Sequence, residues 1–331
     1  MLLLSSFFPL SLILAASAAA PPGPSLRARR SGGCGKAPPF APGQFNDYTT
    51  ASGREYRVWL PAGYDESEPT PLILSYHGAN RVISHQVALD RLSDPLFNDD
   101  HIVVYLQGTA DDPSRPDHTT WEGAPDSTSD DVGFTREALD AVSAALCVDE
   151  RRVFATGKSQ GGGFVGRLAC DAALSARVAA FAPVAGAYYI REIDTEAACL
   201  PASVTVPCAA ARTDVPVLAF HGGADTTIRY AGGFRSGACL PSVRSWARQW
   251  ARRDGLTGAP HNTSIPGSVH GVAMRYGEGA DLGLVTLVYA GDDIGHDWPA
   301  TVENSDNGGE RIAAFNASAW IMDFFRGHAL P

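Results

Sequence analysis

Charged residues are scarce in this sequence, and basic residues are the minority among them. Only 19% of the 331 residues are charged, and the formal net charge is −10. Such a chain repels polyanions, so nucleic-acid binding is disfavoured. The chain also lacks an internal repeat and a Ser/Thr-rich linker, while 45% of its residues are hydrophobic. We therefore predict one domain with one large core over residues 31–331.

Beyond residue 20 the sequence has no apolar run long enough to cross a membrane. The apolar run over residues 2–20 ends in small residues from Ala16 onward, as signal peptidase requires, and it predicts a secretion signal over residues 1–20. A membrane anchor is the alternative. It is disfavoured because the run is shorter than the ~20 residues that a spanning helix needs, and because Pro9 interrupts it. We expect a secreted, extracellular protein without a membrane segment.

Residues 21–30 follow this signal and contain no acidic side chain. They end in Arg27-Ala28-Arg29-Arg30, a basic site that a processing protease of the secretory pathway could cut. Residues 21–30 are therefore a candidate pro-segment, and the mature chain would begin at Ser31. A disordered basic tail is an equal alternative, because composition alone gives disorder here.

Cysteine is rare, and no Cys-x-x-Cys pair occurs. An even number of cysteines after a secretion signal favours disulfide bonds over metal ligation. Among the fifteen connectivities that three bridges allow, we expect Cys147 to pair with Cys170, because the two flank one predicted strand–helix unit. Asn262 and Asn316 begin acceptor sequences for N-glycosylation in the same compartment. The six cysteines are Cys34, Cys147, Cys170, Cys199, Cys208 and Cys239.

Short β-branched runs alternate with helical patterns along the chain. Each run is followed by glycine or a turn, which predicts an α/β fold with a mostly parallel, doubly wound sheet covered on both faces. Two long segments without periodicity, residues 109–131 and 188–213, are expected to shape a site. The expected strands cover residues 56–60, 72–76, 102–106, 153–156, 178–184, 217–220 and 284–289. The expected helices cover about residues 132–146, 160–172, 243–254 and 311–325.

A serine framed by glycines stands between a predicted strand and a predicted helix. The strand leads directly into Gly157-Lys158-Ser159-Gln160-Gly161. In this Gly-x-Ser-x-Gly pattern a strained turn exposes the serine oxygen above the sheet, and the two glycines leave room for the strand–helix crossing. The helix N-terminus adds backbone N–H groups directed at developing negative charge. We predict that Ser159 is a catalytic nucleophile.

Two nucleotide-binding motifs overlap this stretch and do not fit. A P-loop would need glycine five residues before Gly157, where Arg152 stands. Residues 161–166 satisfy Gly-x-Gly-x-x-Gly, but the acidic residue expected about twenty residues further on is missing from residues 181–186. A secreted protein also has little access to a dinucleotide, so we expect no cofactor.

A serine hydroxyl needs a histidine to take its proton and an acid to orient that histidine. In α/β-hydrolases the chain order is Ser, then Asp or Glu, then His, each following a strand. Asp225 follows one predicted strand and His296 follows the last one. We therefore predict a catalytic triad of Ser159, Asp225 and His296.

Three other residues compete for the same roles. Asp292 and Asp293 are rival acids, but the loop of Asp225 precedes His296 by a whole strand, which fits the expected order better. His270 is a rival base. It is disfavoured because it follows no apolar strand, and catalytic groups gather at strand ends.

The oxyanion hole is expected from backbone N–H groups on two turns. One donor is the N–H of Gln160, directly after the nucleophile. A second predicted strand ends in His77-Gly78-Ala79, where the other donor belongs, and we assign it to Gly78 or Ala79. We expect the side chain of His77 to be a core histidine, hydrogen-bonded to a neighbouring loop.

A zinc site is the alternative for the histidines near these strand ends. Its ligands would be His77, His221, His296 and Asp225. No short-spaced pair such as His-Glu-x-x-His supports such a site. We therefore predict no metal.

Several stretches together resemble one known family. They are residues 33–38, residues 146–149 with 152–157, and Leu168-Ala169-Cys170. These resemble fungal feruloyl esterases of carbohydrate esterase family 1, and residues 295–299 also resemble polyhydroxybutyrate-depolymerase-like esterases. The resemblance covers most of residues 34–325. It implies an α/β-hydrolase fold and hydrolysis of feruloyl (hydroxycinnamoyl) esters on plant cell-wall arabinoxylan.

The resemblance also suggests substrate-binding residues. Trp121 falls where the family has a tryptophan near the cleft, although packing of a long loop is an equal alternative. Lys158 stands where relatives carry an aromatic residue, and an ammonium there would favour a substrate with negative charge or an electron-rich ring. Trp298, in the ending shared with the related esterases, is the third candidate.

The leading interpretation is a secreted serine esterase that forms an acyl-enzyme on Ser159. Its partner would be a plant cell-wall polysaccharide or a small ester. The same machinery would serve an acetylxylan esterase or a polyhydroxybutyrate-type polyester depolymerase. A catalytically inactive wall-binding protein on a hydrolase scaffold is the alternative from another class. No feature of the sequence indicates an oligomeric state.

Overall fold

The structure is a computed structural model that describes residues 28–110, 112 and 114–331. The predicted signal (1–20) and most of the candidate pro-segment (21–30) lie outside the described residues. Within the described residues, no helix is both long enough and apolar enough to cross a membrane.

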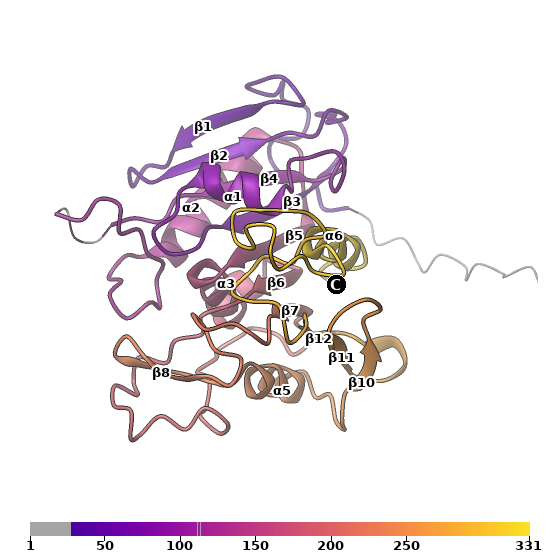
Figure 1. The fold of residues 1–331 in the computed structure, drawn as a ribbon. Coiled ribbons are helices and arrows are strands. Elements are labelled where there is room, and N and C mark those ends of the chain that lie inside the picture. The colour runs from indigo at the N-terminus through magenta and orange to yellow at the C-terminus, as the bar shows by residue number, and fades with distance from the viewer. Residues whose placement is uncertain (1–27, 111, 113) are drawn as a thin grey trace, which may run out of the picture.

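A ten-stranded sheet forms the centre of the molecule, in the order β1-β2-β4-β3-β5-β6-β7-β12-β11-β10. The strands from β4 to β12 in this order are parallel, and antiparallel strands complete both edges. Figure 1 shows the sheet from β1 at the top to β10 near the bottom. The sheet strands are β1 (Phe45–Thr49), β2 (Glu55–Trp59), β3 (Thr70–Tyr76), β4 (Ile102–Leu106), β5 (Val148–Lys158), β6 (Ala180–Val184), β7 (Val217–His221), β10 (His261–Ser264), β11 (Val272–Tyr276) and β12 (Val285–Tyr289). A separate hairpin joins β8 (Gly233–Arg235) to β9 (Ala238–Leu240).

Helices cover both faces of the sheet, as the alternating pattern predicts. Within β3 every residue is buried, because Leu72 and Leu74 pack into the core layer of α2, α3 and α5 while Ile73 packs into that of α1 and α6. Strands buried on both faces read as continuous apolar runs, and this is why the central strands were visible in the sequence. The helices are α1 (Ile83–Asp90), α2 (Asp131–Ala145), α3 (Gln160–Cys170), α4 (Ala172–Ser175), α5 (Val243–Arg253), the 3₁₀ turn η1 (Gly279–Asp281) and α6 (Ala317–Arg326).

Two helix boundaries differ from the prediction for local reasons. The helix expected to start at Arg311 begins at Ala317, because the Asn316 side chain accepts a hydrogen bond from the Ser318 N–H and caps it there. The helix expected to run to Ala172 stops at Cys170, because Asp171 caps a separate short helix.

Three disulfide bonds join the six cysteines, and the expected pairing of Cys147 with Cys170 is wrong. The bridges are Cys34–Cys147, Cys170–Cys208 and Cys199–Cys239. The 11 residues of β5 rise by about 36 Å, whereas the 11 residues of α3 return by only about 16 Å. Cys170 therefore stays far from the start of β5.

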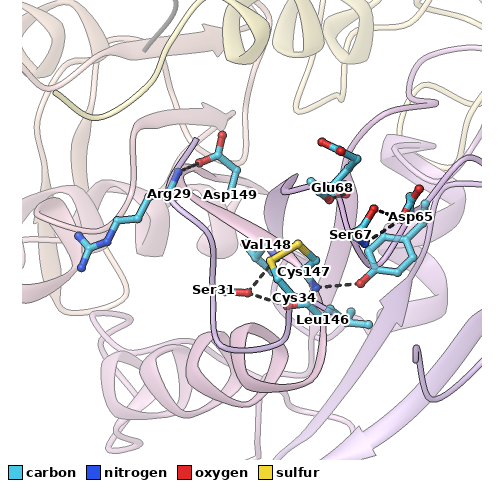
Figure 2. The surroundings of a disulfide bond; sticks show 12 residues. Arg29, Ser31, Cys34, Asp65, Ser67, Glu68, Leu146, Cys147, Val148 and Asp149 are labelled. Atoms are coloured by element: carbon cyan, nitrogen blue, oxygen red, sulfur yellow. Dashed lines mark hydrogen bonds between the residues drawn. A yellow bond between two sulfur atoms is a disulfide. The ribbon is translucent and has the colours of Figure 1, made fainter. Parts of the chain in front are cut away.

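The Cys34–Cys147 bridge fastens the first described segment to the start of β5 (Figure 2). The Ser31 hydroxyl donates to the Leu146 carbonyl at 2.7 Å and accepts from the Val148 N–H at 2.9 Å. The Arg29 N–H donates to the Asp149 carboxylate at 3.0 Å. The two sides of the candidate cleavage point after Arg30 are thus both held against β5.

Candidate active site

Ser159 lies on the turn between β5 and α3, in a backbone conformation that side chains rarely adopt. Its φ and ψ are 57° and −117°. The Ser159 N–H donates to the Val184 carbonyl at 2.9 Å, and its carbonyl accepts from the Ala187 N–H at 3.0 Å. These bonds to the segment that follows β6 hold the strained turn in place.

Gly157 and Gly161 allow this turn because neighbouring backbone comes too close for any side chain. A Cβ on Gly157 would lie 2.8 Å from Gly161 backbone, and one on Gly161 would lie 2.4 Å from the carbonyl oxygens of Tyr76 and His77. The pattern of the two glycines in the sequence therefore reflects a physical requirement of the strand–helix crossing.

The three residues predicted as a triad are joined by hydrogen bonds. His296 Nε2 lies 2.8 Å from Ser159 Oγ, and His296 Nδ1 lies 2.7 Å from Asp225 Oδ2. Because a carboxylate can only accept, Nδ1 carries the proton, and Nε2 is free to accept the serine hydroxyl proton. Each residue follows the carboxyl end of a parallel strand, so they meet at one edge of the sheet.

Asp225 is buried, and three donors converge on it. Oδ1 accepts from the N–H groups of Thr227 at 2.9 Å and Ile228 at 2.7 Å, while Oδ2 accepts from His296 Nδ1 at 2.7 Å. His221 Nε2 lies 3.2 Å from Oδ2 but donates its hydrogen bond to the Ile228 carbonyl at 2.6 Å. Burial alone would raise the pKa of Asp225, but the favourable interactions with His221 and His296 outweigh it and lower the pKa below its ordinary range. The carboxylate therefore stays charged.

His296 has a lowered pKa despite its carboxylate partner. Burial contributes most to this lowering and the positive charge of Lys158 comes next, while Asp225 acts in the opposite direction. A lowered pKa keeps the imidazole neutral near pH 7, as a general base must be. Its loop is fastened to that of Asp225 by the Ala224 N–H, which donates to the Ile294 carbonyl at 2.9 Å.

The two turns expected to form an oxyanion hole lie beside Ser159. A Cβ on Gly78 would be only 3.5 Å from that of Ser159, and Gln160 is the first residue of α3. His77 Nδ1 donates to the Gly78 carbonyl at 2.7 Å, which fixes the peptide between Gly78 and Ala79. In a planar trans peptide the Ala79 N–H points away from that carbonyl.

His77 is a buried core histidine. Its Nε2 accepts from the Gly108 N–H at 2.8 Å, so its side chain joins the β3 end to the loop after β4. Burial lowers the pKa of His77 to about 4, which keeps it neutral. Across the described ranges, no group of three or more His, Cys, Asp or Glu residues is arranged to hold a metal ion.

The rival residues lie apart from Ser159. His270 Nδ1 pairs with Asp292 Oδ2 at 2.7 Å on the surface, where the His270 side chain is 81% exposed. The acid that contacts His296 is Asp225 rather than Asp292 or Asp293.

The three residues expected to bind substrate are all buried. Trp121, 1% exposed, stacks on Phe164 and donates from Nε1 to the His77 carbonyl at 2.7 Å. Trp298, 0% exposed, donates from Nε1 to Ser318 Oγ at 3.0 Å. The Lys158 ammonium donates to the His296 carbonyl. The structure does not bring these side chains to an open surface.

A cavity of about 530 Å³ runs along α3 next to this site. Gln160 and Gly163 line the end nearest Ser159, and the Cys170–Cys208 bridge lines the other end. Much of its wall comes from residues 122–130, 188–192 and 206–209, within the two segments expected to shape the site. Neither Ser159 nor His296 is among the lining residues, so the cavity adjoins the triad rather than enclosing it.

The two glycosylation candidates differ in accessibility. Asn262 lies on β10, whose residues are all exposed. Asn316 caps α6, and the serine of its acceptor sequence, Ser318, is buried with its hydroxyl donating to the Asp90 carbonyl.

Two residues at the site were not assigned their present roles from the sequence. His221, considered there only as a zinc ligand, lies 3.2 Å from Asp225 Oδ2, the same oxygen that His296 contacts. Its position four residues before Asp225 in the sequence could have indicated that the two side chains lie close together. Asp306, 3.2 Å from the Lys158 ammonium, lies in a loop without any periodicity, and no sequence signal marks it.

The parallel sheet with Ser159, Asp225 and His296 at the carboxyl ends of its strands defines an α/β-hydrolase fold. No protein-family model matches the chain. The acetyl xylan esterase from Aspergillus awamori has a similar fold, with a TM-score of 0.53 and 13% identity over 77% of this chain and 94% of that one.

The sequence relatives of the chain are esterases of one kind. The chain is 28% identical to feruloyl esterase B of Piromyces equi over 71% of its own length and 41% of the relative's. It is 33% identical to feruloyl esterase D of Neurospora crassa over 52% of its length and 56% of that protein's, and 28% identical to the probable feruloyl esterase C of Aspergillus niger over 70% and 79%. The chain thus spans less than two thirds of two of these relatives. The resemblance to fungal feruloyl esterases predicted from the sequence is confirmed.

Proposed function

We propose that the protein is a secreted serine esterase that hydrolyses feruloyl esters of plant cell-wall arabinoxylan. The observation that carries the proposal is the continuous hydrogen-bonded chain from Ser159 through His296 to Asp225 on a strained turn. This arrangement of nucleophile, base and orienting acid is what acyl transfer needs. The names of the sequence relatives support the feruloyl group as the acyl part.

In the acylation step Ser159 Oγ attacks the ester carbonyl carbon while His296 Nε2 takes the hydroxyl proton. Asp225 stabilises the imidazolium that forms. The carbonyl oxygen becomes an oxyanion, for which the N–H groups of Gln160 and Ala79 are the proposed donors. When the intermediate collapses, the C–O bond to the alcohol breaks, and His296 gives the proton to the leaving sugar oxygen, which departs as a hydroxyl group.

Deacylation repeats these steps with water. His296 takes a proton from the water molecule, whose oxygen attacks the acyl carbon. The bond to Ser159 Oγ then breaks, the serine regains its proton from His296, and the free carboxylic acid leaves.

The cavity beside Gln160 supports a small neutral acyl group or sugar as its occupant. Its volume of about 530 Å³ lies within the range of ~300–1,000 Å³ typical of small-molecule sites. Tyr189 and Ile190 supply apolar wall, and Glu122 is paired with Arg167 at 2.6 Å, so the wall carries compensated charge there.

Labelling with a fluorophosphonate probe tests the serine mechanism. Wild-type protein should react and Ser159→Ala should not, because the probe bonds only to an activated serine. Absence of labelling on folded wild-type protein would contradict the proposal and favour an inactive wall-binding protein. Circular dichroism of both proteins shows whether they are folded.

A substrate panel tests the acyl specificity. Methyl ferulate, acetylated xylan and short-chain polyhydroxybutyrate are assayed side by side, and we expect the highest kcat/KM on methyl ferulate. Faster release of acetate would indicate an acetylxylan esterase, and faster release of hydroxybutyrate a polyester depolymerase. Either result would overturn the feruloyl assignment while leaving the serine mechanism in place.

A further inference from the structure

Lys158 is an unusual residue in an unusual place. Only two of the 26 basic residues are lysines, and Lys158 directly precedes the nucleophile. It is the last residue of β5, where it pairs with Val184 of β6. The other lysine, Lys36, lies exposed near the first disulfide. The sequence alone suggested that the Lys158 ammonium would meet the substrate.

The ammonium of Lys158 instead has two partners in the loop after β12. Its Nζ donates to the His296 main-chain carbonyl at 3.0 Å and lies 3.2 Å from Asp306 Oδ2. The Lys158 side chain is 5% exposed and that of Asp306 is 11% exposed. The same Asp306 oxygen also accepts from the Trp298 N–H at 2.9 Å. One buried ion pair therefore joins the nucleophile turn to both ends of the segment 296–298.

A buried charge is costly unless its partners are well placed. The ion pair between Lys158 and Asp306 is therefore stable only when the two side chains keep this arrangement. An ammonium is a compact charge with three donors, and it can reach a carbonyl and a carboxylate at once. Because one of those partners is the carbonyl of His296 itself, a shift of the ammonium shifts the imidazole relative to Ser159 Oγ.

We propose that Lys158 is a positioning residue that, with Asp306, holds the main chain of His296 against the nucleophile turn. The inference rests on the proposed function, because His296 is the base whose position matters. It replaces substrate contact as the role of Lys158. A misplacement of about 1 Å at a reacting group can cost about 100-fold in rate, which makes such a link effective.

The charges around His296 make its pKa sensitive to Lys158 and Asp306, which a purely structural role of Lys158 would not do. Asp225 and His221 face the imidazole from the end of β7, and Lys158 faces it from β5. Asp306 balances Lys158, and both act also on His85 at the start of α1. Asp297, next in the loop, is paired with Arg311 at 3.1 Å. Lys158 lowers the pKa of His296, and neutralising Asp306 leaves that charge unbalanced.

Opposite shifts of the pH profile are therefore expected from the two partners. In Lys158→Met the acid limb of kcat/KM should move to higher pH, whereas in Asp306→Asn it should move to lower pH. With methyl ferulate as substrate, Lys158→Met should lose about 10- to 100-fold in kcat with KM within about threefold of wild type. Lys36→Met is the matched control and should keep both constants within about twofold of wild type.

Two measurements are independent of activity. Hydrogen exchange of residues 291–306 should accelerate in Lys158→Met and not in Lys36→Met. An NMR titration of the His296 imidazole, assigned by comparison with His296→Ala, should show the same opposite shifts. If Lys158→Met does not fold, Asp306→Asn, which keeps the lysine, carries the test.

The outcomes separate this inference from the proposed function. An active wild type whose Lys158→Met variant keeps kcat but raises KM tenfold would show substrate contact and overturn the inference. Unmoved pH profiles and unchanged exchange in both variants would also overturn it. A folded wild type that neither labels nor hydrolyses esters would refute the proposed function, while the titration and the exchange would still decide whether the link exists.

Discussion

Two histidine–aspartate pairs in this protein share one geometry and differ in their surroundings. In each, Nδ1 lies 2.7 Å from a carboxylate oxygen: His296 with Asp225, and His270 with Asp292. The His296 side chain is 19% exposed and that of Asp225 0%, against 81% and 48% for the surface pair. Only His296 has a serine hydroxyl at its other nitrogen.

The same pairing therefore gives opposite protonation behaviour. The hydrogen bond from His270 to Asp292 raises the pKa of His270, because the exposed imidazolium keeps its hydration. Burial and the charge of Lys158 lower the pKa of His296 in spite of Asp225. A carboxylate neighbour alone thus does not make a base that is neutral near pH 7, and burial decides the difference.

The carboxylates differ as well. Asp225 receives hydrogen bonds from His296 and two backbone N–H groups, whereas Asp292 receives them from His270 and from the Tyr289 hydroxyl at 2.5 Å. The fold holds the Asp225 carboxylate in one position, whereas Asp292 lies in contact with water. The buried pair is built to keep one geometry.

The largest contrast should come from removing each histidine. We expect His296→Ala to lose about 10⁴-fold or more in kcat/KM on methyl ferulate, because the serine loses its base. His270→Ala should stay within about twofold of wild type, because it contacts no nucleophile. Loss of activity in His270→Ala with His296→Ala largely intact would reverse the assignment of the base.

The carboxylates should show a smaller but similar contrast. Asp225→Asn should lower kcat by about 10³- to 10⁴-fold, because an amide can no longer hold the Nδ1–H tautomer of His296. Asp292→Asn has almost the same shape change on the surface and should have no measurable effect. Equal losses in both variants would contradict a special role for Asp225.

The second histidine beside Asp225 should have a moderate effect. In His221→Phe the Ile228 carbonyl loses its donor, which loosens the turn whose Ile228 N–H donates to Asp225, and we expect about a tenfold loss in kcat with little change in KM. Tyr289→Phe removes a donor from Asp292 and serves as the control, with kcat unchanged. Full activity in His221→Phe would mean that the three donors to Asp225 hold it in place without His221.

Sequence patterns predicted the strands that are buried on both faces. They did not predict elements that are only partly buried. Each expected strand has a counterpart, from β2 to β12, because continuous apolar runs are easy to see. The edge strands β1 and β10 were missed, since their exposed residues need no apolar pattern. The helix α1 was missed because its weakly amphipathic sequence carries no clear stripe.

The candidate site was predictable where it depends on chain order and not where it depends on contacts between loops. Ser159, Asp225 and His296 follow strands in the order that the fold imposes, so the sequence predicts them. The bond from Lys158 to the His296 carbonyl spans 138 residues and joins a strand end to an irregular loop. No local pattern encodes such a contact, and the same holds for the disulfide pairing.

The smallest expected effect is on stability, where the two pairs should have opposite pH dependence. The pKa of His296 is lowered by folding, so the unfolded chain binds the proton more tightly and stability falls as pH drops below about 6.5. The pKa of His270 is raised, so its contribution is present below about 6.5 and is lost as pH rises through its folded-state value. Urea unfolding at about pH 5 and about pH 8 measures both.

His296→Ala should reduce the loss of stability between these two pH values, and His270→Ala should increase it. For each variant, the urea midpoint at about pH 5 is subtracted from that at about pH 8, which removes the constant cost of the substitution itself. The contributions of the other titrating groups cancel when these differences are compared between variants. Changes of the same sign in both variants would mean that the contrast in burial does not control the two imidazoles. Changes of opposite sign would show that burial controls the protonation of the two imidazoles in folding as well as in catalysis. One difference in solvation would then account for the catalytic contrast and for the stability contrast.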